Sequence, residues 1–119
     1  MNPELAYYAV RYYSNLMTDV EHLADRHLTS TIKAMHGRDD ADAQREAMRH
    51  HRFIRFVSQD PEVVGLAKEG MRAFRARTAA RILEMHGDQV FLNRCPRCNE
   101  LARTPKAKQC RACGFDWHS

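Results

Sequence analysis

The sequence predicts a mainly α-helical protein: a three-helix bundle with one long helix, followed by a small C-terminal β-hairpin. Apolar residues recur every three or four positions through most of residues 2–87, the period of an amphipathic helix. Residues typical of helix starts and stops bound these stretches. All four cysteines of the 119-residue chain lie near its C-terminus. We therefore expect a helical domain over 1–89 and a cysteine module over 90–119.

The first predicted helix begins at Asn2 and ends at Gly37. Asn2 is a good N-cap, Pro3 suits the first helical position, and Glu4 suits the positive end of the helix dipole. A glycine in the left-handed conformation is a common helix terminus. The helix would exceed about 30 residues, or about 50 Å. Its apolar stripe consists of Leu5, Ala9, Tyr12, Leu16, Val20, Leu23, His27 and Met35.

Two further helices are expected after the polar connector GRDDAD. The second is capped by Asp39 or Asp40 and has its apolar stripe over 47–57. The third begins with Asp60, Pro and Glu, and ends at a second MHG tripeptide over 85–87. Its apolar stripe consists of Val64, Ala67, Met71, Phe74, Thr78, Ile82 and Met85.

The cysteines form two pairs, Cys95-x2-Cys98 and Cys110-x2-Cys113, separated by 11 residues. Two cysteines at this spacing on a tight turn direct both sulfurs to one point, and two such turns complete a tetrahedral metal site. Paired cysteines are more often metal ligands than disulfides in a reducing compartment. The pattern therefore predicts one structural Zn²⁺ per chain, held by all four cysteines.

The turn residues agree with this interpretation. Gly114 follows the second pair and Asn99 the first, and these two residue types tolerate positive φ best. Pro96 stiffens the first turn, and Thr104-Pro105 marks a bend between the pairs. The segment GDQVFLNRC at 87–95 is expected to supply a strand that leads into the first turn.

The stretch CPRCNELARTPKAKQCRACGFDW resembles the short zinc-ribbon modules found at the ends of many bacterial and archaeal proteins. Their pattern is Cys-Pro-x-Cys-Gly, about ten residues, then Cys-x-x-Cys-Gly and an aromatic residue. Asn99 replaces the usual first glycine. The resemblance covers about 25 residues and implies a structural zinc in a small β-hairpin. It implies no single function, because such modules bind nucleic acids, dock proteins or stabilise a fold.

Other roles for the cysteines and histidines are weaker. Disulfides need an oxidising compartment, iron as in rubredoxin has a longer separation between its cysteine turns, and a thioredoxin-like pair needs a strand–helix setting. A catalytic zinc needs an open coordination position, which four cysteines close. No nucleophile, base and orienting acid occur at suggestive spacing. We therefore expect no enzymatic activity.

The net charge of +4 is located in the cysteine module. Residues 1–92 contain 13 Lys and Arg against 13 Asp and Glu, whereas residues 93–119 contain six against two. Four thiolates with one Zn²⁺ would add about −2, so basicity alone does not establish nucleic-acid binding. The side chains expected to contact a partner or nucleic acid are Arg97, Arg103, Lys106, Lys108, Arg111 and Trp117.

These observations predict a small zinc-binding docking or regulatory protein, with DNA or RNA binding through the basic module as the alternative. The tyrosine-rich patch at 7–13 is wider than one partner helix needs and indicates a homodimer through the helical part; half-exposed tyrosines are the simpler account. An unknown protein partner is expected as well. No apolar run long enough for a membrane span and no signal-peptide layout are found, so we expect a cytoplasmic protein.

Overall fold

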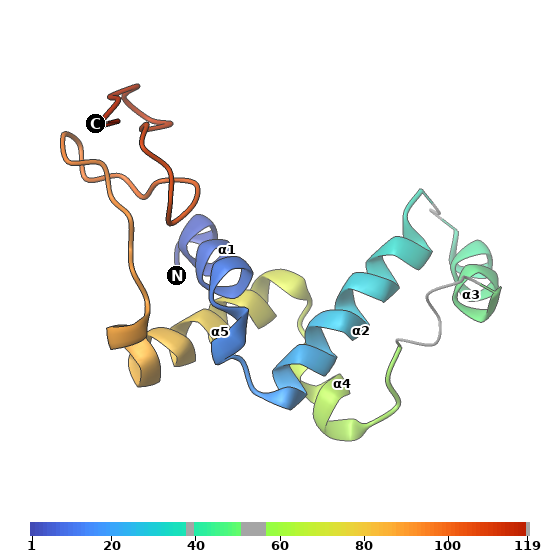
Figure 1. The fold of residues 1–119 in the computed structure, drawn as a ribbon. Coiled ribbons are helices and arrows are strands. Elements are labelled where there is room, and N and C mark those ends of the chain that lie inside the picture. The colour runs from blue at the N-terminus through green and yellow to red at the C-terminus, as the bar shows by residue number, and fades with distance from the viewer. Residues whose placement is uncertain (38–39, 51–56, 119) are drawn as a thin grey trace. The chain divides into compact units, whose positions relative to one another are not determined.

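The computed structural model describes residues 1–37, 40–50 and 57–118, without the side chains of Ala47, Met48 and His50. This part of the chain is mainly helical, as predicted, but it holds five α-helices instead of the predicted three (Figure 1). None of these helices is long and apolar enough to cross a membrane. The elements are α1 (Pro3–Tyr12), η1 (Ser14–Leu16), α2 (Asp19–Met35), α3 (Ala41–His50), α4 (Pro61–Ala67), α5 (Met71–His86) and η3 (Gly87–Gln89).

The predicted single helix over 2–37 is wrong, because the chain leaves the helix after Tyr12. Thr18 caps α2: its hydroxyl accepts a hydrogen bond from the Glu21 N–H at 3.1 Å, and the Glu21 carboxylate accepts one from the Thr18 N–H at 2.8 Å. This capping box satisfies two N–H groups at a helix start. The break also shifts the helical phase, so Leu23 of the predicted stripe is exposed.

The predicted third helix is divided at Gly70, which has a φ of 95°. This left-handed conformation favours glycine and separates α4 from α5. Because the buried face of α4 passes through Val63 and Ala67, Val64 of the predicted stripe is exposed. Most of the stripe predicted for the second helix lies outside the described residues.

Residues Thr18–Phe74 form one compact unit, in which α2 contacts both α3 and α4. His27 on α2 accepts a hydrogen bond at Nδ1 from the Ser58 N–H at 2.9 Å, so this ring joins the helix to the segment before α4. The buried apolar side chains of this unit are Ala24, Leu28, Ala34, Val63, Ala67 and Phe74.

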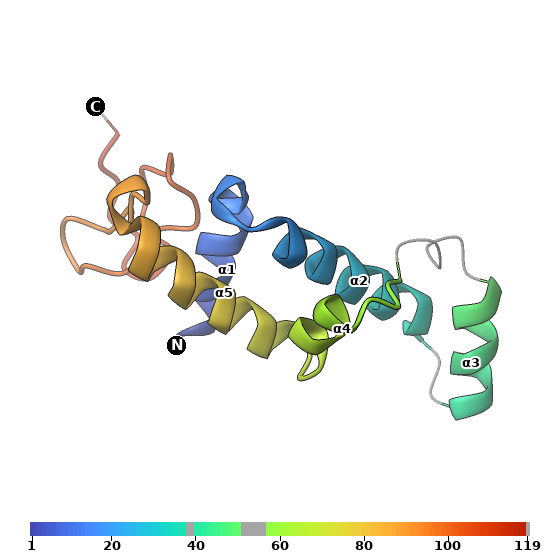
Figure 2. The same cartoon turned by 90° about the horizontal axis from the view of Figure 1, so that it is seen from below.

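The other compact unit combines Met1–Met17 with Arg75–Ser119. Figure 2 shows α1 beside the later turns of α5 and the C-terminal segment. The Arg81 guanidinium donates to the Leu16 carbonyl at 2.9 Å, and Arg75 lies over the Tyr7 ring at 5.2 Å. The buried apolar residues of this unit are Ala6, Tyr8, Ala9, Val10, Met17, Ala79, Ile82, Leu101 and Ala102, with Cys95 and Cys110 of the cysteine turns. Helix α1 therefore packs with the cysteine module, although the two lie at opposite ends of the sequence.

The predicted β-hairpin is contradicted: residues 90–118 contain no strand. They contain two isolated antiparallel bridges, Arg94–Leu101 and Gln109–Asp116. Each bridge joins the two ends of one cysteine turn, and neither bridge joins one turn to the other. The bridges therefore do not extend into a β-ladder. The strand expected over 87–95 is likewise absent, since this segment begins with the short helix η3.

Candidate metal centre

The two cysteine pairs lie in turns with the same hydrogen bonds. In the first turn the Cys95 N–H donates to the Glu100 carbonyl at 2.8 Å, and the Asn99 N–H donates to the Cys95 carbonyl at 2.9 Å. The second turn repeats both bonds at the same offsets from Cys110, at 2.8 and 3.0 Å. The two turns are therefore two copies of one local structure.

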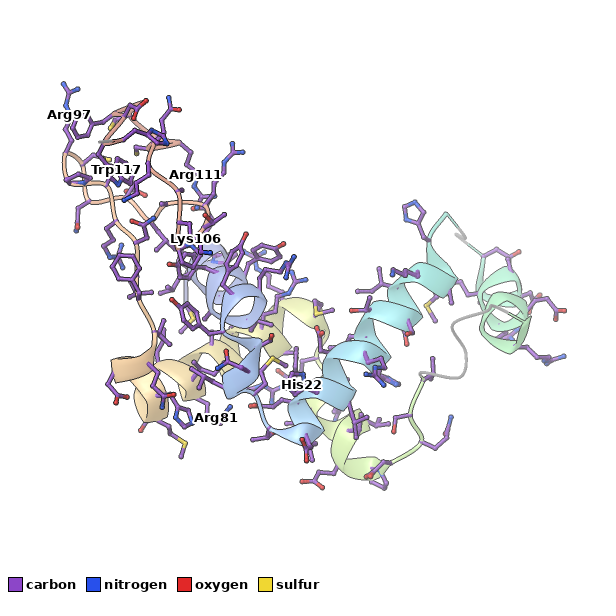
Figure 3. All side chains as sticks on the ribbon, in the orientation of Figure 1. His22, Arg81, Arg97, Lys106, Arg111 and Trp117 are labelled. Carbon is purple, nitrogen blue, oxygen red and sulfur yellow. The ribbon has the colours of Figure 1, made fainter. Side chains whose placement is uncertain are left out.

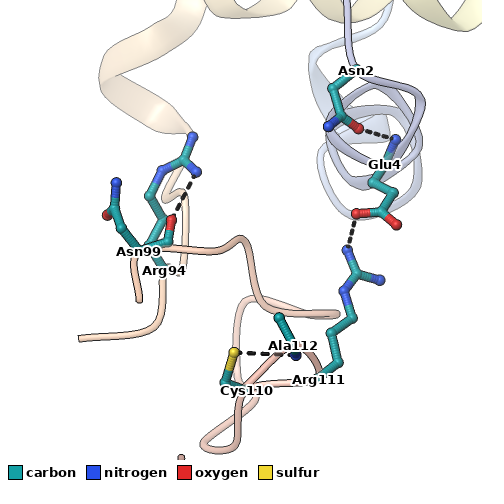
Figure 4. A network of polar contacts seen from close by, with 7 residues as sticks. All are labelled: Asn2, Glu4, Arg94, Asn99, Cys110, Arg111 and Ala112. Atoms are coloured by element: carbon teal, nitrogen blue, oxygen red, sulfur yellow. Dashed lines mark hydrogen bonds and ion pairs between the residues drawn. The ribbon is translucent and has the colours of Figure 1, made fainter. Parts of the chain in front are cut away.

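The leading cysteine of each turn accepts hydrogen bonds from two backbone N–H groups. Cys95 Sγ accepts from the N–H groups two and three residues later at 3.3 and 3.4 Å. Cys110 Sγ does the same at 3.3 and 3.4 Å, and Figure 4 shows its bond from Ala112. Donors directed at sulfur stabilise a thiolate over a thiol.

Positive φ angles close both turns, as predicted. Asn99 has a φ of 68° and Gly114 a φ of 79°. A side chain at such an angle is strained, and glycine and asparagine tolerate it best. Asn99 therefore has the same left-handed conformation as Gly114 in the second turn.

The turns bring all four sulfurs together, within 4.8 Å of one another. Cys95 Sγ lies 3.7 Å from Cys113 Sγ, and Cys98 Sγ lies 3.5 Å from Cys110 Sγ. A tetrahedron with metal–sulfur bonds of about 2.3 Å has sulfur–sulfur edges of about 3.8 Å. The cysteines are free thiols, and their spacing fits a single tetrahedral ion. This cluster of four cysteines is a candidate structural metal site.

The thiols differ in acidity. The pKa of Cys110 is lowered to about 6, chiefly by the backbone N–H groups of Cys113 and Ala112. Burial acts to raise the pKa of Cys95, but N–H groups directed at its sulfur lower it overall. The Glu100 backbone acts to lower the pKa of Cys98, yet burial and the neighbouring thiols raise it to about 12. Cys95 and Cys110 are 2% and 3% exposed, whereas Cys98 and Cys113 face solvent.

Asn93 holds the loop between the two turns. Its side-chain amide donates to the carbonyls of Thr104 and Ala107, each at 2.9 Å. Its own carbonyl accepts from the Ala102 N–H at 2.7 Å. At 6% exposure, Asn93 fixes both ends of the basic loop, here defined as residues 103–108.

Tyr8 of α1 and Tyr13, which follows the last residue of α1, anchor the segment that leads into the first turn. The Tyr8 hydroxyl donates to the Phe91 carbonyl at 2.6 Å and accepts from the Asn93 N–H at 3.2 Å. The Tyr13 hydroxyl accepts from the Phe91 N–H at 3.0 Å. The pKa of Tyr8 is raised, chiefly because its side chain is buried. Part of the tyrosine-rich patch is thus covered within the chain, and the homodimer stays a prediction.

The predicted contact residues differ in their surroundings. Arg97, Lys106, Arg111 and Trp117 all extend from the cysteine module (Figure 3). Arg111 is paired with Glu4 of α1 at 2.9 Å (Figure 4). Within the described part of the chain, no ion pair involves the other predicted cations, all of them exposed: Arg97, Arg103, Lys106 and Lys108.

The aromatic residues after the second turn lie side by side. The rings of Phe115 and Trp117 are 6.3 Å apart between centroids, and both side chains are half-buried. The Trp117 N–H donates to the Lys108 carbonyl at 2.8 Å, which places the tryptophan next to the basic loop. His118 pairs with Asp116.

Sequence reasoning missed Asn93, Tyr8 and Tyr13 as parts of this site. Asn93 lies two residues before Cys95, where nothing in the cysteine pattern indicates it. The tyrosines belong to a patch that was interpreted as a dimer surface. Their partners are about 80 residues away in sequence, and local patterns do not report such contacts.

Comparisons with protein-family models, with curated proteins and with solved structures give no match for this chain.

Proposed function

We propose that this chain is a non-enzymatic zinc protein in which Cys95, Cys98, Cys110 and Cys113 hold one structural Zn²⁺ in a zinc-ribbon-like module. The sulfur geometry supports this, because two of its edges, 3.5 and 3.7 Å, approach those of a tetrahedral zinc–thiolate site. Four thiolates with directed N–H donors suit zinc better than harder cations, which prefer oxygen.

Cobalt substitution tests the metal site. The full chain should bind one Co²⁺ with the visible absorption of a tetrahedral thiolate complex, and Zn²⁺ should displace it. Cys98→Ser should lose this spectrum, whereas Ser14→Ala, remote from the cysteines in the sequence, should keep it. A spectrum of octahedral cobalt, or none, would refute the zinc assignment.

We propose protein docking or regulation as the role of the module. A closed four-thiolate shell leaves no coordination position for a substrate, which favours a structural metal. The module also presents exposed side chains on a fixed backbone, because Asn93 and the two cysteine turns hold it. Cross-linking in lysate, followed by mass spectrometry, should place a protein partner on residues 97–117. Cross-links confined to residues 18–74 would contradict docking through the module.

Nucleic-acid binding is a second candidate, favoured by the charge of the unit that contains the cysteines. Met1–Met17 with Arg75–Ser119 hold ten Lys and Arg against five Asp and Glu, a net +5, whereas Thr18–Phe74 hold nine against ten, a net −1. A tetrathiolate zinc site reduces the first value to about +3. The cations of the basic loop have no ion-pair partner among the described residues, so they are accessible to phosphates.

Charge reversal separates the two candidates. If the basic loop binds nucleic acid, Arg103→Glu with Lys106→Glu should abolish binding to labelled DNA or RNA. The wild-type affinity should fall steeply with salt, because phosphate contacts release counterions. Lys68→Glu with Arg72→Glu is the matched control, since it changes the net charge equally at exposed residues of the other unit. Equal loss in both double variants, or no loss in either, would exclude the loop as the nucleic-acid site.

A further inference from the structure

A buried chain of hydrogen bonds joins helix α1 to the loop between the cysteine turns. It runs from the Tyr8 hydroxyl to the Asn93 N–H at 3.2 Å, and from the Asn93 side-chain amide to the carbonyls of Thr104 and Ala107 at 2.9 Å. Tyr8 is 1% exposed. We call Tyr8 and Asn93 the relay. The polar groups of the relay are hydrogen-bonded to each other and to the loop carbonyls. Breaking one of these bonds therefore leaves a buried donor or acceptor unpaired.

We propose that the relay makes helix α1 a metal-controlled element: zinc at the four cysteines holds α1 and the basic loop in one body, and loss of zinc releases both. This inference rests on the proposed zinc site and goes beyond it by assigning a regulatory role to the metal.

The metal acts on the relay through the first cysteine turn. Cys95 lies two residues after Asn93, and the Asn93 carbonyl binds the Ala102 N–H just beyond the same turn. Without a metal, four thiols at these distances have no bond that holds the turns together, and so small a module has little apolar core of its own. The first cysteine turn and the basic loop are then no longer held in place around Asn93, and the Tyr8 hydroxyl loses the Asn93 N–H as its hydrogen-bond donor.

Release of α1 would expose apolar surface. Ala6, Tyr8, Ala9 and Val10 form the buried face of α1, and they are covered within the unit that contains the metal module. A helix of ten residues is too short to be stable in water on its own, and the contact of α1 with α5 through Tyr7 and Arg75 involves an exposed ring. The Glu4–Arg111 ion pair is exposed and contributes little by itself. The Phe91 N–H bond to the Tyr13 hydroxyl is exposed as well, so the relay supplies the buried polar contact between α1 and the module.

Hydrogen exchange of the full chain tests this inference directly. With one zinc bound, peptides that cover Pro3–Tyr12 should exchange slowly, and a chelator should raise their exchange rate to that of the cysteine module. Peptides from α2 should keep their rate. Equal exchange of α1 in the two metal states would overturn the inference, and so would an equal increase in α2.

Variants of the tyrosines test the relay itself. Coupling between two equilibria is reciprocal. If bound zinc stabilises the Tyr8–Asn93 hydrogen bond, this bond must increase the affinity for zinc by the same factor. Tyr8→Phe keeps the ring but removes the hydroxyl, and it should weaken zinc binding about tenfold in competition with a chromophoric chelator. Tyr12→Phe is the matched control, since among the described residues the Tyr12 hydroxyl has no hydrogen-bond partner, and its affinity should stay within about twofold.

The outcomes distinguish the two levels of the proposal. A wild-type chain that takes up no zinc in the chelator competition refutes the proposed function before any exchange is measured. One zinc per chain with equal affinities for Tyr8→Phe and wild type refutes the relay and leaves the zinc site in place.

Discussion

Asn99 and Gly114 occupy equivalent positions, each directly after the second cysteine of its turn, and both have positive φ. A Cβ added at Gly114 would meet nothing within 4 Å, so substitution there changes backbone strain without creating a clash. Gly114→Ala should therefore destabilise the zinc-bound module by about 1 kcal/mol and weaken zinc binding roughly fivefold.

The control for this prediction is Gly87→Ala. Gly87 also has open space around a Cβ but no positive φ, so its substitution should leave zinc affinity nearly unchanged. Chelator competition measures both variants. Equal affinities for Gly114→Ala and Gly87→Ala would show that backbone strain does not limit the second turn.

Zinc uptake should depend on pH, because zinc binds thiolates and displaces the protons of the thiols. In the folded turns, backbone N–H groups directed at its sulfur lower the pKa of Cys110 to about 6. The affinity for zinc should therefore fall as the pH is lowered from about 8 to about 6, since protons compete for the sulfurs. Calorimetry in buffers of different ionisation enthalpy counts the protons released. A zinc affinity that does not change over this range would contradict thiolate ligation.

At the scale of elements, caps decide where the helices begin. Thr18→Ala removes the hydroxyl that accepts from the Glu21 N–H at the start of α2 and should cost about 1 kcal/mol in the free energy of unfolding. Ser14→Ala alters an exposed hydroxyl in η1 and should cost under about 0.5 kcal/mol. Urea unfolding monitored by circular dichroism compares the two. A loss in Thr18→Ala no larger than in Ser14→Ala would mean that the capping box does not stabilise α2.

The same caps explain which elements could be predicted. Asn2 and Asp60 were recognised as helix starts because Pro and Glu follow them, and both side chains accept the expected N–H bond. Thr18 with Glu21 is also a helix-start signal, but the apolar period continues across it and predicts a single helix. The hairpin was predicted wrongly for a different reason. The backbone hydrogen bonds of each cysteine turn form within that turn and not between the two turns, and the cysteine spacing is compatible with either arrangement.

At the scale of the whole molecule, the cysteine spacing was sufficient to predict which residues would come together, because the ligands lie in two short turns. The surroundings were not predictable, since the relay joins residues 85 positions apart. Helix α1 belongs to the compact unit that contains the cysteines. The domain boundary predicted between residues 89 and 90 stays a prediction.

We propose that the four cysteines hold one zinc ion, and native mass spectrometry of the full untagged chain, purified without chelators, measures the bound metal. We expect one zinc for each chain, retained after dilution and lost in Cys98→Ser. A metal-free chain whose mass is four hydrogens light, as two disulfides require, would contradict it.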